Sequence, residues 1–136
     1  MAKKILITGG AGYIGSHTAL ELLNEGYEVV VYDNLCNSSK ESLKRVEELT
    51  GKMITFYEGD VMDEVALKAM LEKEGVDAVI HCAGAVRGAS SDEFNQINTE
   101  GSVRLIESVR NAGTCERFLL MSTLAARYPG LSWYAS

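Results

Sequence analysis

The chain has 136 residues, of which 13 are Lys or Arg and 19 are Asp or Glu, giving a formal net charge of −6 at neutral pH. Nucleic acids and anionic membrane surfaces repel an acidic protein, so neither is an expected partner. The length suits a single domain and is too short for a complete two-domain enzyme. The three cysteines form no C-x-x-C pair, which favours a reducing, cytoplasmic environment over a disulfide framework or a metal site.

An apolar run at residues 5–7 stops at a cluster of glycines, which predicts a strand, a tight turn and the start of a helix. The glycines follow the spacing Gly9-x-x-Gly12-x-x-Gly15. Such a turn needs a positive φ, a place where the backbone meets a pyrophosphate, and a close contact between helix and strand. Because the start of a helix attracts anions, the spacing predicts a dinucleotide phosphate site.

The helix after this turn is expected from about Gly12 to Glu25, closed by Gly26. Its side chains expected to face the sheet are Ile14, Leu22 and Leu23. A second strand at residues 28–32 leads into Asp33, whose carboxylate is placed to accept both hydroxyls of an adenosine ribose. An ordinary turn residue at the end of a strand is the alternative interpretation of Asp33.

Two more helices and a third strand are expected between residues 38 and 75. A capping box of Ser38 and Glu41 opens the first of these helices, which ends at Gly51. Its apolar face is assigned to Leu43, Val46 and Leu49. The strand at residues 53–57 runs into Asp60 and the Val61 N–H, which are predicted to reach an adenine edge, or else to form a plain turn. The next helix, residues 63–74, is expected to bury Val65, Leu67, Met70 and Leu71.

The fourth strand starts at Asp77 and runs into a turn of small residues, where the backbone of Ala83 and Gly84 is able to pass close to a dinucleotide. His81 is interpreted as a hydrogen-bonded strand residue in preference to an acid or base. A long helix is expected over residues 90–112, interrupted by Asn98 and Gly101, each for a hydrogen bond or for close packing. A fifth strand follows at residues 117–121.

Strands that alternate with helices predict an α/β fold. Right-handed connections wind the five strands into a Rossmann-like, doubly wound parallel sheet of order 3-2-1-4-5, with helices on both faces. A ligand crevice is expected between strands 1 and 4, where the chain reverses direction.

Three motifs carry a resemblance to a known family: residues 7–18, 33–38 and 57–60. Residues 1–81 resemble the extended short-chain dehydrogenase/reductase family, and its UDP-glucose 4-epimerase branch in particular. The resemblance implies NAD as the cofactor, with contacts at Tyr13, Ile14, Asp33, Asn34, Leu35, Cys36, Asn37, Ser38, Asp60 and Val61. The remaining candidate NAD-binding residues are Gly9, Gly12, Gly15, Cys82, Ala83, Gly84 and Asn98. A UDP-sugar is the further ligand that the resemblance implies.

The resemblance to this branch weakens after residue 81. Residues 82–86 read Cys-Ala-Gly-Ala-Val where the branch has Phe-Ala-Gly-Leu-Lys, so a lysine that helps hold the cofactor is missing. Residues from 122 onward are more similar to other members of the extended family. These differences suggest a truncated chain that was recombined or engineered from two pieces.

Catalysis in the family requires a Ser or Thr after the fifth strand and a Tyr-x-x-x-Lys pair. Thr123 and Tyr134 match the first two, but the lysine falls at position 138, beyond Ser136. Three hypotheses remain open: an NAD-binding module without efficient catalysis, a nucleotide-sugar epimerase with a trimmed site, and an engineered chain that folds without activity. Asp33 favours NAD over NADP, since it repels a 2′-phosphate. An unpaired fifth strand and apolar surface on the last helix predict a homo-oligomer.

Overall fold

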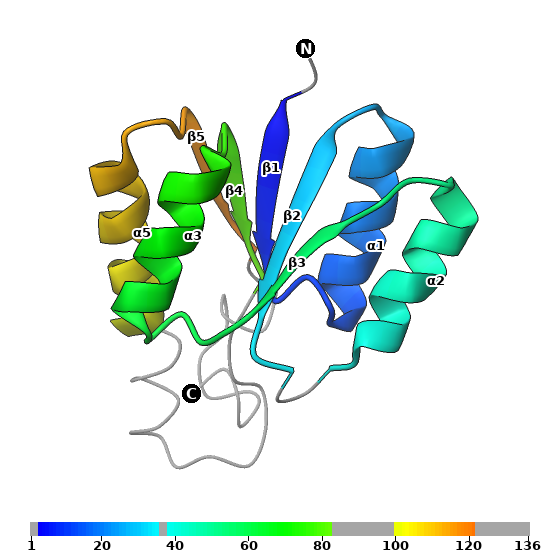
Figure 1. The fold of residues 1–136 in the computed structure, drawn as a ribbon, viewed down its shortest axis with the longest axis horizontal. Helices are drawn as coiled ribbons and strands as arrows, with labels where there is room; N and C mark the ends of the chain where they lie inside the picture. Colours follow the sequence, from blue (N-terminus) through cyan, green and yellow to red (C-terminus); the bar gives the residue numbers. More distant parts are fainter. Residues whose placement is uncertain (1–2, 36–37, 83–99, 122–136) are drawn as a thin grey trace, which may run out of the picture.

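A computed structural model describes residues 3–35, 38–82 and 100–121. Its five strands, all parallel, form one sheet in the order β3-β2-β1-β4-β5 (Figure 1). The strands are β1 (Lys4–Thr8), β2 (Glu28–Asp33), β3 (Thr55–Glu58), β4 (Ala78–His81) and β5 (Arg117–Leu120). The predicted fold class and strand order are therefore confirmed.

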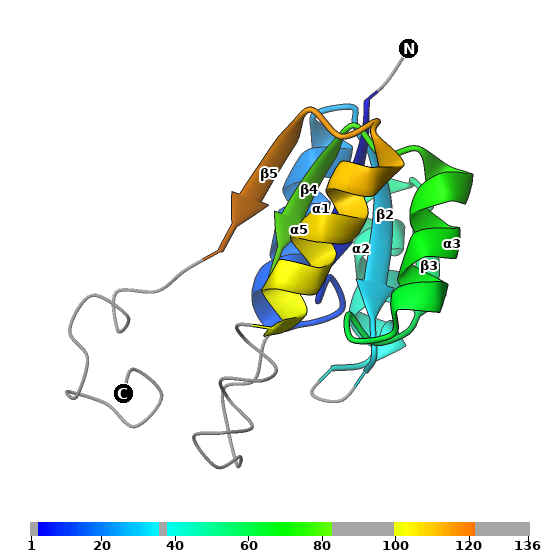
Figure 2. The ribbon, with the colours of Figure 1, turned by 90° about the vertical axis from the view of Figure 1, so that its left-hand side faces the viewer.

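Helices cover both faces of the sheet (Figures 1 and 2). One face carries α1 (Tyr13–Asn24) and α2 (Lys40–Thr50), and the other carries α3 (Glu64–Glu74) and α5 (Gly101–Ala112). Successive residues of a strand point to opposite faces, which divides the core in two. Below α1 and α2 lie Ile7, Val29 and Val31. Below α3 and α5 lie Leu6, Val30, Tyr32 and Val79.

The ends of α2 and α3 agree with the predicted stops. Gly51 and Gly75 end these helices in the left-handed conformation. The predicted capping box at Ser38 is wrong by one residue, because Ser39 caps α2 by accepting a hydrogen bond from the Glu41 N–H. The Ser38 hydroxyl instead donates to Asp33 Oδ1 at 3.1 Å. Ser38, which the pattern assigned to the start of the helix, therefore contacts Asp33 instead.

Three residues predicted to face the core are exposed. Ile14 is 54% exposed, Leu49 75% and Val65 81%. On α1 the buried positions are mostly small, Gly15, Ser16 and Ala19 together with Leu23, because this helix starts close to the sheet. Leu49 is turned about 120° around α2 from the buried Leu43, and Val65 is turned about 160° from Leu67 around α3. The spacing of the apolar residues therefore predicted a wider buried face on these helices than the structure has.

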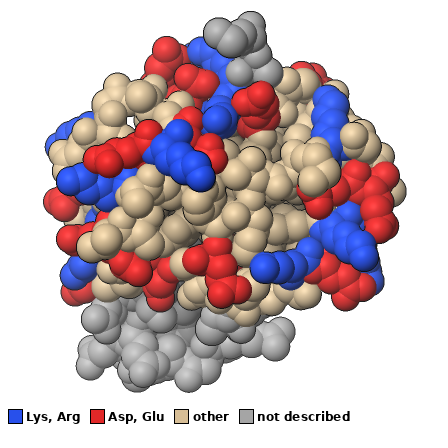
Figure 3. All heavy atoms as spheres, in the orientation of Figure 1, with Lys and Arg blue, Asp and Glu red and all other residues tan. Residues whose placement is uncertain are grey.

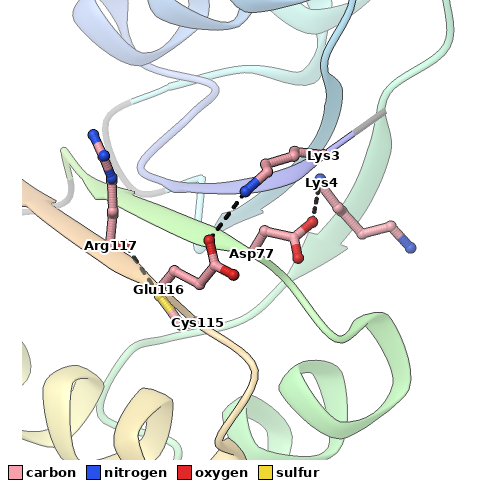
Figure 4. Close-up of polar contacts among 6 residues, drawn as sticks. All are labelled: Lys3, Lys4, Asp77, Cys115, Glu116 and Arg117. Atoms are coloured by element: carbon pink, nitrogen blue, oxygen red, sulfur yellow. Dashed lines mark hydrogen bonds and ion pairs between the residues drawn. The ribbon is translucent and has the colours of Figure 1, made fainter. Parts of the chain in front are cut away.

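Polar contacts align three strands at the amino end of the sheet (Figure 4). The Lys4 N–H donates to Asp77 Oδ2 at 2.8 Å, which aligns the starts of β1 and β4. Lys3 Nζ donates to Glu116 Oε2 at 3.0 Å, an exposed ion pair next to the start of β5. These contacts lie at the opposite end of the strands from the glycine turn. They therefore serve the fold and contribute nothing directly to the site.

The surface is charged but mixed in sign. Figure 3 shows acidic and basic side chains interspersed over α2 and α3 on the face it presents. Within the described ranges, no helix combines the length and apolar character needed to cross a bilayer. The same ranges contain no group of three His, Cys, Asp or Glu side chains arranged to hold a metal ion.

Candidate functional site

The turn after β1 is tight and closed by its own backbone. Gly9 has a φ of +69°, a conformation that favours glycine, and its N–H donates to the Tyr32 carbonyl at 2.9 Å. The Gly12 N–H then donates to the Gly9 carbonyl at 3.1 Å. These bonds place the start of α1 directly over the carboxyl ends of β1 and β2.

Gly12 and Gly15 differ in what surrounds them. A Cβ on Gly15 would lie 2.3 Å from the Gly9 oxygen and 2.6 Å from Gly10 Cα, so the packing of the turn against α1 excludes any side chain. A Cβ on Gly12 would meet only the Gly9 oxygen at 3.4 Å, and its φ of −76° suits any residue. The fold itself therefore requires Gly15 and leaves space at Gly12.

Gly10 also belongs to the turn, although the glycine spacing gave it no role. A Cβ there would lie 2.7 Å from Val31 Cγ2, so the turn packs directly on β2. The apolar alternation of β2 gave no signal for this contact, because it joins residues far apart in the sequence.

The start of α1 has no side-chain cap, in contrast to the starts of α2 and α3. Ser39 accepts a bond at the start of α2, and Asp63 accepts one from the Ala66 N–H at the start of α3. The cap position of α1 is Gly12, which has no side chain to offer. Tyr13 and Ile14 are the first residues of this helix, so their N–H groups and the positive end of the helix dipole are available to an anion.

Asp33 is buried at the end of β2 and joins three parts of the site. Its Oδ2 accepts a hydrogen bond from the Ala11 N–H of the glycine turn at 3.0 Å. Its Oδ1 accepts one from the Leu35 N–H at 2.8 Å and one from the Ser38 hydroxyl at 3.1 Å. Leu35 adopts a φ of +59° next to the exposed Asn34. The carboxylate therefore shapes the turn, and a ribose would bind to a group that is already hydrogen-bonded.

Ser42 is a second support of the turn that sequence reasoning missed. Its hydroxyl lies 2.6 Å from the Ala11 carbonyl and 2.8 Å from the Ser39 carbonyl, so it is able to donate to either. A serine in the first turn of a helix carries no sequence signal for a contact with a loop about thirty residues earlier.

The loop after β3 lies beside the end of β2. Asp60 is exposed, and its Oδ1 accepts a hydrogen bond from the Met62 N–H at 2.9 Å. Val61 is buried in the core, and its Cγ2 lies 3.0 Å from the place where a Cβ on Gly101 would stand. Of the two reasons predicted for Gly101, a hydrogen bond or close packing, the structure shows close packing.

His81 ends β4 and is buried between β1 and α5. Its Nδ1 lies 2.5 Å from Thr8 Oγ1, and its Nε2 lies 2.9 Å from Ser102 Oγ. Burial lowers the pKa of His81 below its usual value, so the imidazole is neutral at neutral pH. It is the hydrogen-bonded strand histidine that was predicted. The neighbouring Cys82 is half-buried, and burial raises the pKa of its thiol.

The structure brings the residues of the glycine turn together with Asp33, Asn34, Leu35 and Ser38 at one edge of the sheet. Cys82 follows β4 at this edge, and its N–H donates to the Thr8 carbonyl at 3.0 Å. Several candidate residues lie outside the described ranges, namely Cys36, Asn37, Ala83, Gly84, Asn98, Thr123 and Tyr134.

The fold is similar to that of solved structures of known proteins. UDP-glucose 4-epimerase from Bifidobacterium longum, in complex with NAD+ and UDP, superposes with a TM-score of 0.86 at 32% identity. The match covers 96% of this chain and 40% of that one.

Sequence relatives agree. The UDP-glucose 4-epimerase of Erwinia amylovora is 49% identical over 123 residues, 88% of this chain and 36% of that protein. The UDP-glucose 4-epimerase of Klebsiella pneumoniae is 42% identical over 124 residues, 88% of both sequences. The chain thus spans about a third of the Erwinia relative. Each alignment is longer than the 81 residues that carry the strongest motifs, and the recombined origin stays a prediction.

The family itself is identified over nearly the whole chain. Residues 5–132 match the Epimerase family, described as the NAD dependent epimerase/dehydratase family. The short-chain dehydrogenase/reductase resemblance that the three motifs carry is confirmed by this match and by the relatives. The chain belongs to the NAD dependent epimerase/dehydratase family.

Proposed function

We propose that this chain is the NAD(H)-binding domain of a UDP-glucose 4-epimerase-like protein. The observation that carries the proposal is the space at Gly12, at the uncapped start of α1 and one residue from the Ala11 N–H that Asp33 accepts. Nothing in the fold requires a glycine at that position, whereas the close approach of a pyrophosphate to the backbone there would require one. The Asp33 carboxylate then serves the adenosine ribose, and Asp60 with the Val61 N–H serves the adenine.

The remaining contacts of the proposed NAD site come from the turn and from the ends of β2 and β4. Tyr13 and Ile14 offer backbone N–H groups to the phosphates, and Asn34, Leu35 and Ser38 surround the ribose. Cys36, Asn37, Cys82, Ala83, Gly84 and Asn98 complete the proposed site. NAD supplies a hydride acceptor when bound, and the residues of this chain hold and orient it.

Turnover of a UDP-sugar is not proposed for these 136 residues alone. Proton removal in the family depends on a Tyr-x-x-x-Lys pair, of which the sequence contains only the proposed tyrosine, Tyr134, with Thr123 as its companion. A tyrosine without a neighbouring cation has a pKa of about 10 and is a poor base at neutral pH. Binding of a UDP-sugar and its epimerisation are proposals for a longer protein that contains this domain.

The test is a calorimetric titration of NADH and NADPH into the purified chain. We expect saturable binding of NADH and weaker binding of NADPH, because the Asp33 carboxylate repels a 2′-phosphate. The absence of any binding would contradict the NAD proposal. Tighter binding of NADPH would contradict the assignment of Asp33 to the ribose.

Self-association is a further proposal. Within the described ranges β5 pairs with β4 alone, and its Leu119 and Leu120 side chains are 54% and 56% exposed. Val103 and Ile106 add exposed apolar surface on α5. Exposed apolar side chains and an edge strand favour contact with a second copy. Sedimentation velocity is expected to show a coefficient that rises with concentration, and a monomer at high concentration would contradict the proposal.

The proposed cellular location is the cytoplasm. The two cysteines that the structure describes, Cys82 and Cys115, are both unpaired thiols. Burial raises the pKa of each thiol, which keeps it protonated and unreactive. Free thiols of this kind suit a reducing compartment.

A further inference from the structure

Tyr32 is a buried residue of β2 that the proposed NAD site does not use directly. It precedes Asp33, and only 2% of its surface is exposed. Successive side chains of a strand point to opposite faces, so Tyr32 enters the core below α3 and α5. Its hydroxyl nevertheless extends to the loop after β3, where it donates to the Asp60 carbonyl at 2.8 Å.

The phenol also occupies the space next to Gly59. A Cβ on Gly59 would lie 2.5 Å from the Tyr32 hydroxyl oxygen and 2.7 Å from Cζ. The backbone of residues 59 and 60 therefore rests directly on the tyrosine. A glycine is needed at position 59 because the Tyr32 ring fills the space that a side chain there would occupy. The two residues therefore form one contact.

The loop closes around the carbonyl that Tyr32 holds. The Asp60 oxygen also accepts the Asp63 N–H at 2.9 Å, and Asp60 Oδ1 accepts the Met62 N–H at 2.9 Å. Asp63 is in turn the cap of α3. Tyr32 thus connects β2 to the start of α3 through the residue whose side chain is proposed to read the adenine.

We propose that Tyr32 is a positioning residue, which holds the loop of residues 59–61 so that the Asp60 carboxylate and the Val61 N–H face the adenine of a bound dinucleotide. This inference rests on the proposed NAD function and assigns the base specificity of that site to a residue that does not touch the ligand. Burial, with the nearby Asp63 and Asp60 carboxylates, raises the pKa of Tyr32 to about 12. The Tyr32 phenol is therefore protonated at neutral pH and remains a hydrogen-bond donor there.

The chain offers a matched control for this tyrosine. Tyr57 of β3 is paired with Tyr32 in the sheet register. Its hydroxyl donates to Glu74 Oε1 at 3.0 Å, on α3 and away from the loop of residues 59–61. Replacement of each tyrosine by phenylalanine removes one hydroxyl from one of two adjacent strands. The Asp60 carbonyl loses a donor only in Tyr32→Phe.

The experiment compares NAD with nicotinamide hypoxanthine dinucleotide, which lacks the adenine amino group, by calorimetric titration into wild type, Tyr32→Phe and Tyr57→Phe. We expect wild type to prefer NAD, because the Asp60 carboxylate accepts a hydrogen bond from that amino group. Tyr32→Phe is expected to reduce the preference about three- to tenfold, the range of one hydrogen bond. Tyr57→Phe is expected to leave it unchanged. If Tyr32→Phe only disturbed the local structure, it would weaken the binding of both dinucleotides equally. The ratio of their dissociation constants would then stay the same.

Amide hydrogen exchange of the ligand-free proteins provides a second measurement. Tyr32→Phe is expected to accelerate exchange at Met62 and Asp63, whose N–H groups bond to Asp60, while Tyr57→Phe leaves these amides protected. A wild-type chain that binds neither dinucleotide would contradict the proposed function. A chain that binds NAD with a preference unaltered by Tyr32→Phe, or one whose Met62 and Asp63 amides keep their protection in that variant, would contradict the role of Tyr32.

Discussion

Gly15→Ala is expected to lower the free energy of unfolding by about 3 kcal/mol or more, the upper range for an overpacked position. The added methyl group would lie 2.3 Å from the Gly9 oxygen and 2.6 Å from Gly10 Cα. Both neighbours are backbone atoms, which cannot rotate away as the end of a flexible side chain can. Relief requires α1 to move off the turn and open the packing of Ala19 and Leu23 against the sheet. A thermal melt is expected to show a loss of roughly 10 °C.

Gly12→Ala is the matched control, because it adds the same methyl group three residues earlier in the same turn. The new Cβ would make an ordinary contact of 3.4 Å, and the backbone conformation suits alanine. Its melting temperature is expected to stay close to that of wild type. Its affinity for NADH is expected to fall about tenfold or more, since the methyl group occupies the space proposed for the pyrophosphate.

The two variants separate the needs of the fold from those of the ligand. A stable Gly15→Ala chain would contradict the packing of α1 on the turn. A Gly12→Ala chain that binds NADH as tightly as wild type would contradict the phosphate site while leaving the fold intact. Either result is visible in one melt and one titration.

Local patterns in the sequence were sufficient for the sheet and the glycine turn. The alternation of Leu6, Ile7, Val30 and Val31 between two core faces follows from the period of a strand, and a positive φ at Gly9 follows from the glycine spacing. Both depend on residues close together in the chain. Physical constraints of this local kind leave a readable pattern.

The supports of the site depend on contacts between distant residues, and no local pattern encodes them. Ser42 reaches Ala11, and Tyr32 reaches Asp60. Each is a polar side chain within a helix or strand, where sequence reasoning assigns surface or core. The misassigned Leu49 shows the same limit, since an apolar residue near the buried stripe of α2 lies in solvent. The glycine motif therefore predicts where a ligand binds, but it does not predict which side chains hold the ligand-binding residues in place.

Asp33→Ala is the substitution expected to change the ligand site most. It removes the acceptor of the Ala11 N–H, the Leu35 N–H and the Ser38 hydroxyl together. A buried N–H left without a partner costs about 1–3 kcal/mol, so the variant is expected to be less stable as well as to bind NADH at least about tenfold more weakly. Weaker NADH binding alone therefore fails to distinguish a lost ribose contact from a loosened turn.

The ratio of the NADPH and NADH dissociation constants makes that distinction. A loosened turn weakens both cofactors equally, whereas loss of the carboxylate removes a repulsion that acts only on the 2′-phosphate. Asp33→Ala is thus expected to shift the ratio toward NADPH by about tenfold. Ser42→Ala is the control: it removes a hydrogen-bond donor to the Ala11 carbonyl of the turn and leaves the carboxylate in place, so both cofactors should weaken with the ratio unchanged. A ratio that Asp33→Ala does not alter would show that the carboxylate only supports the turn, and the ribose contact would have to come from Asn34 or Ser38.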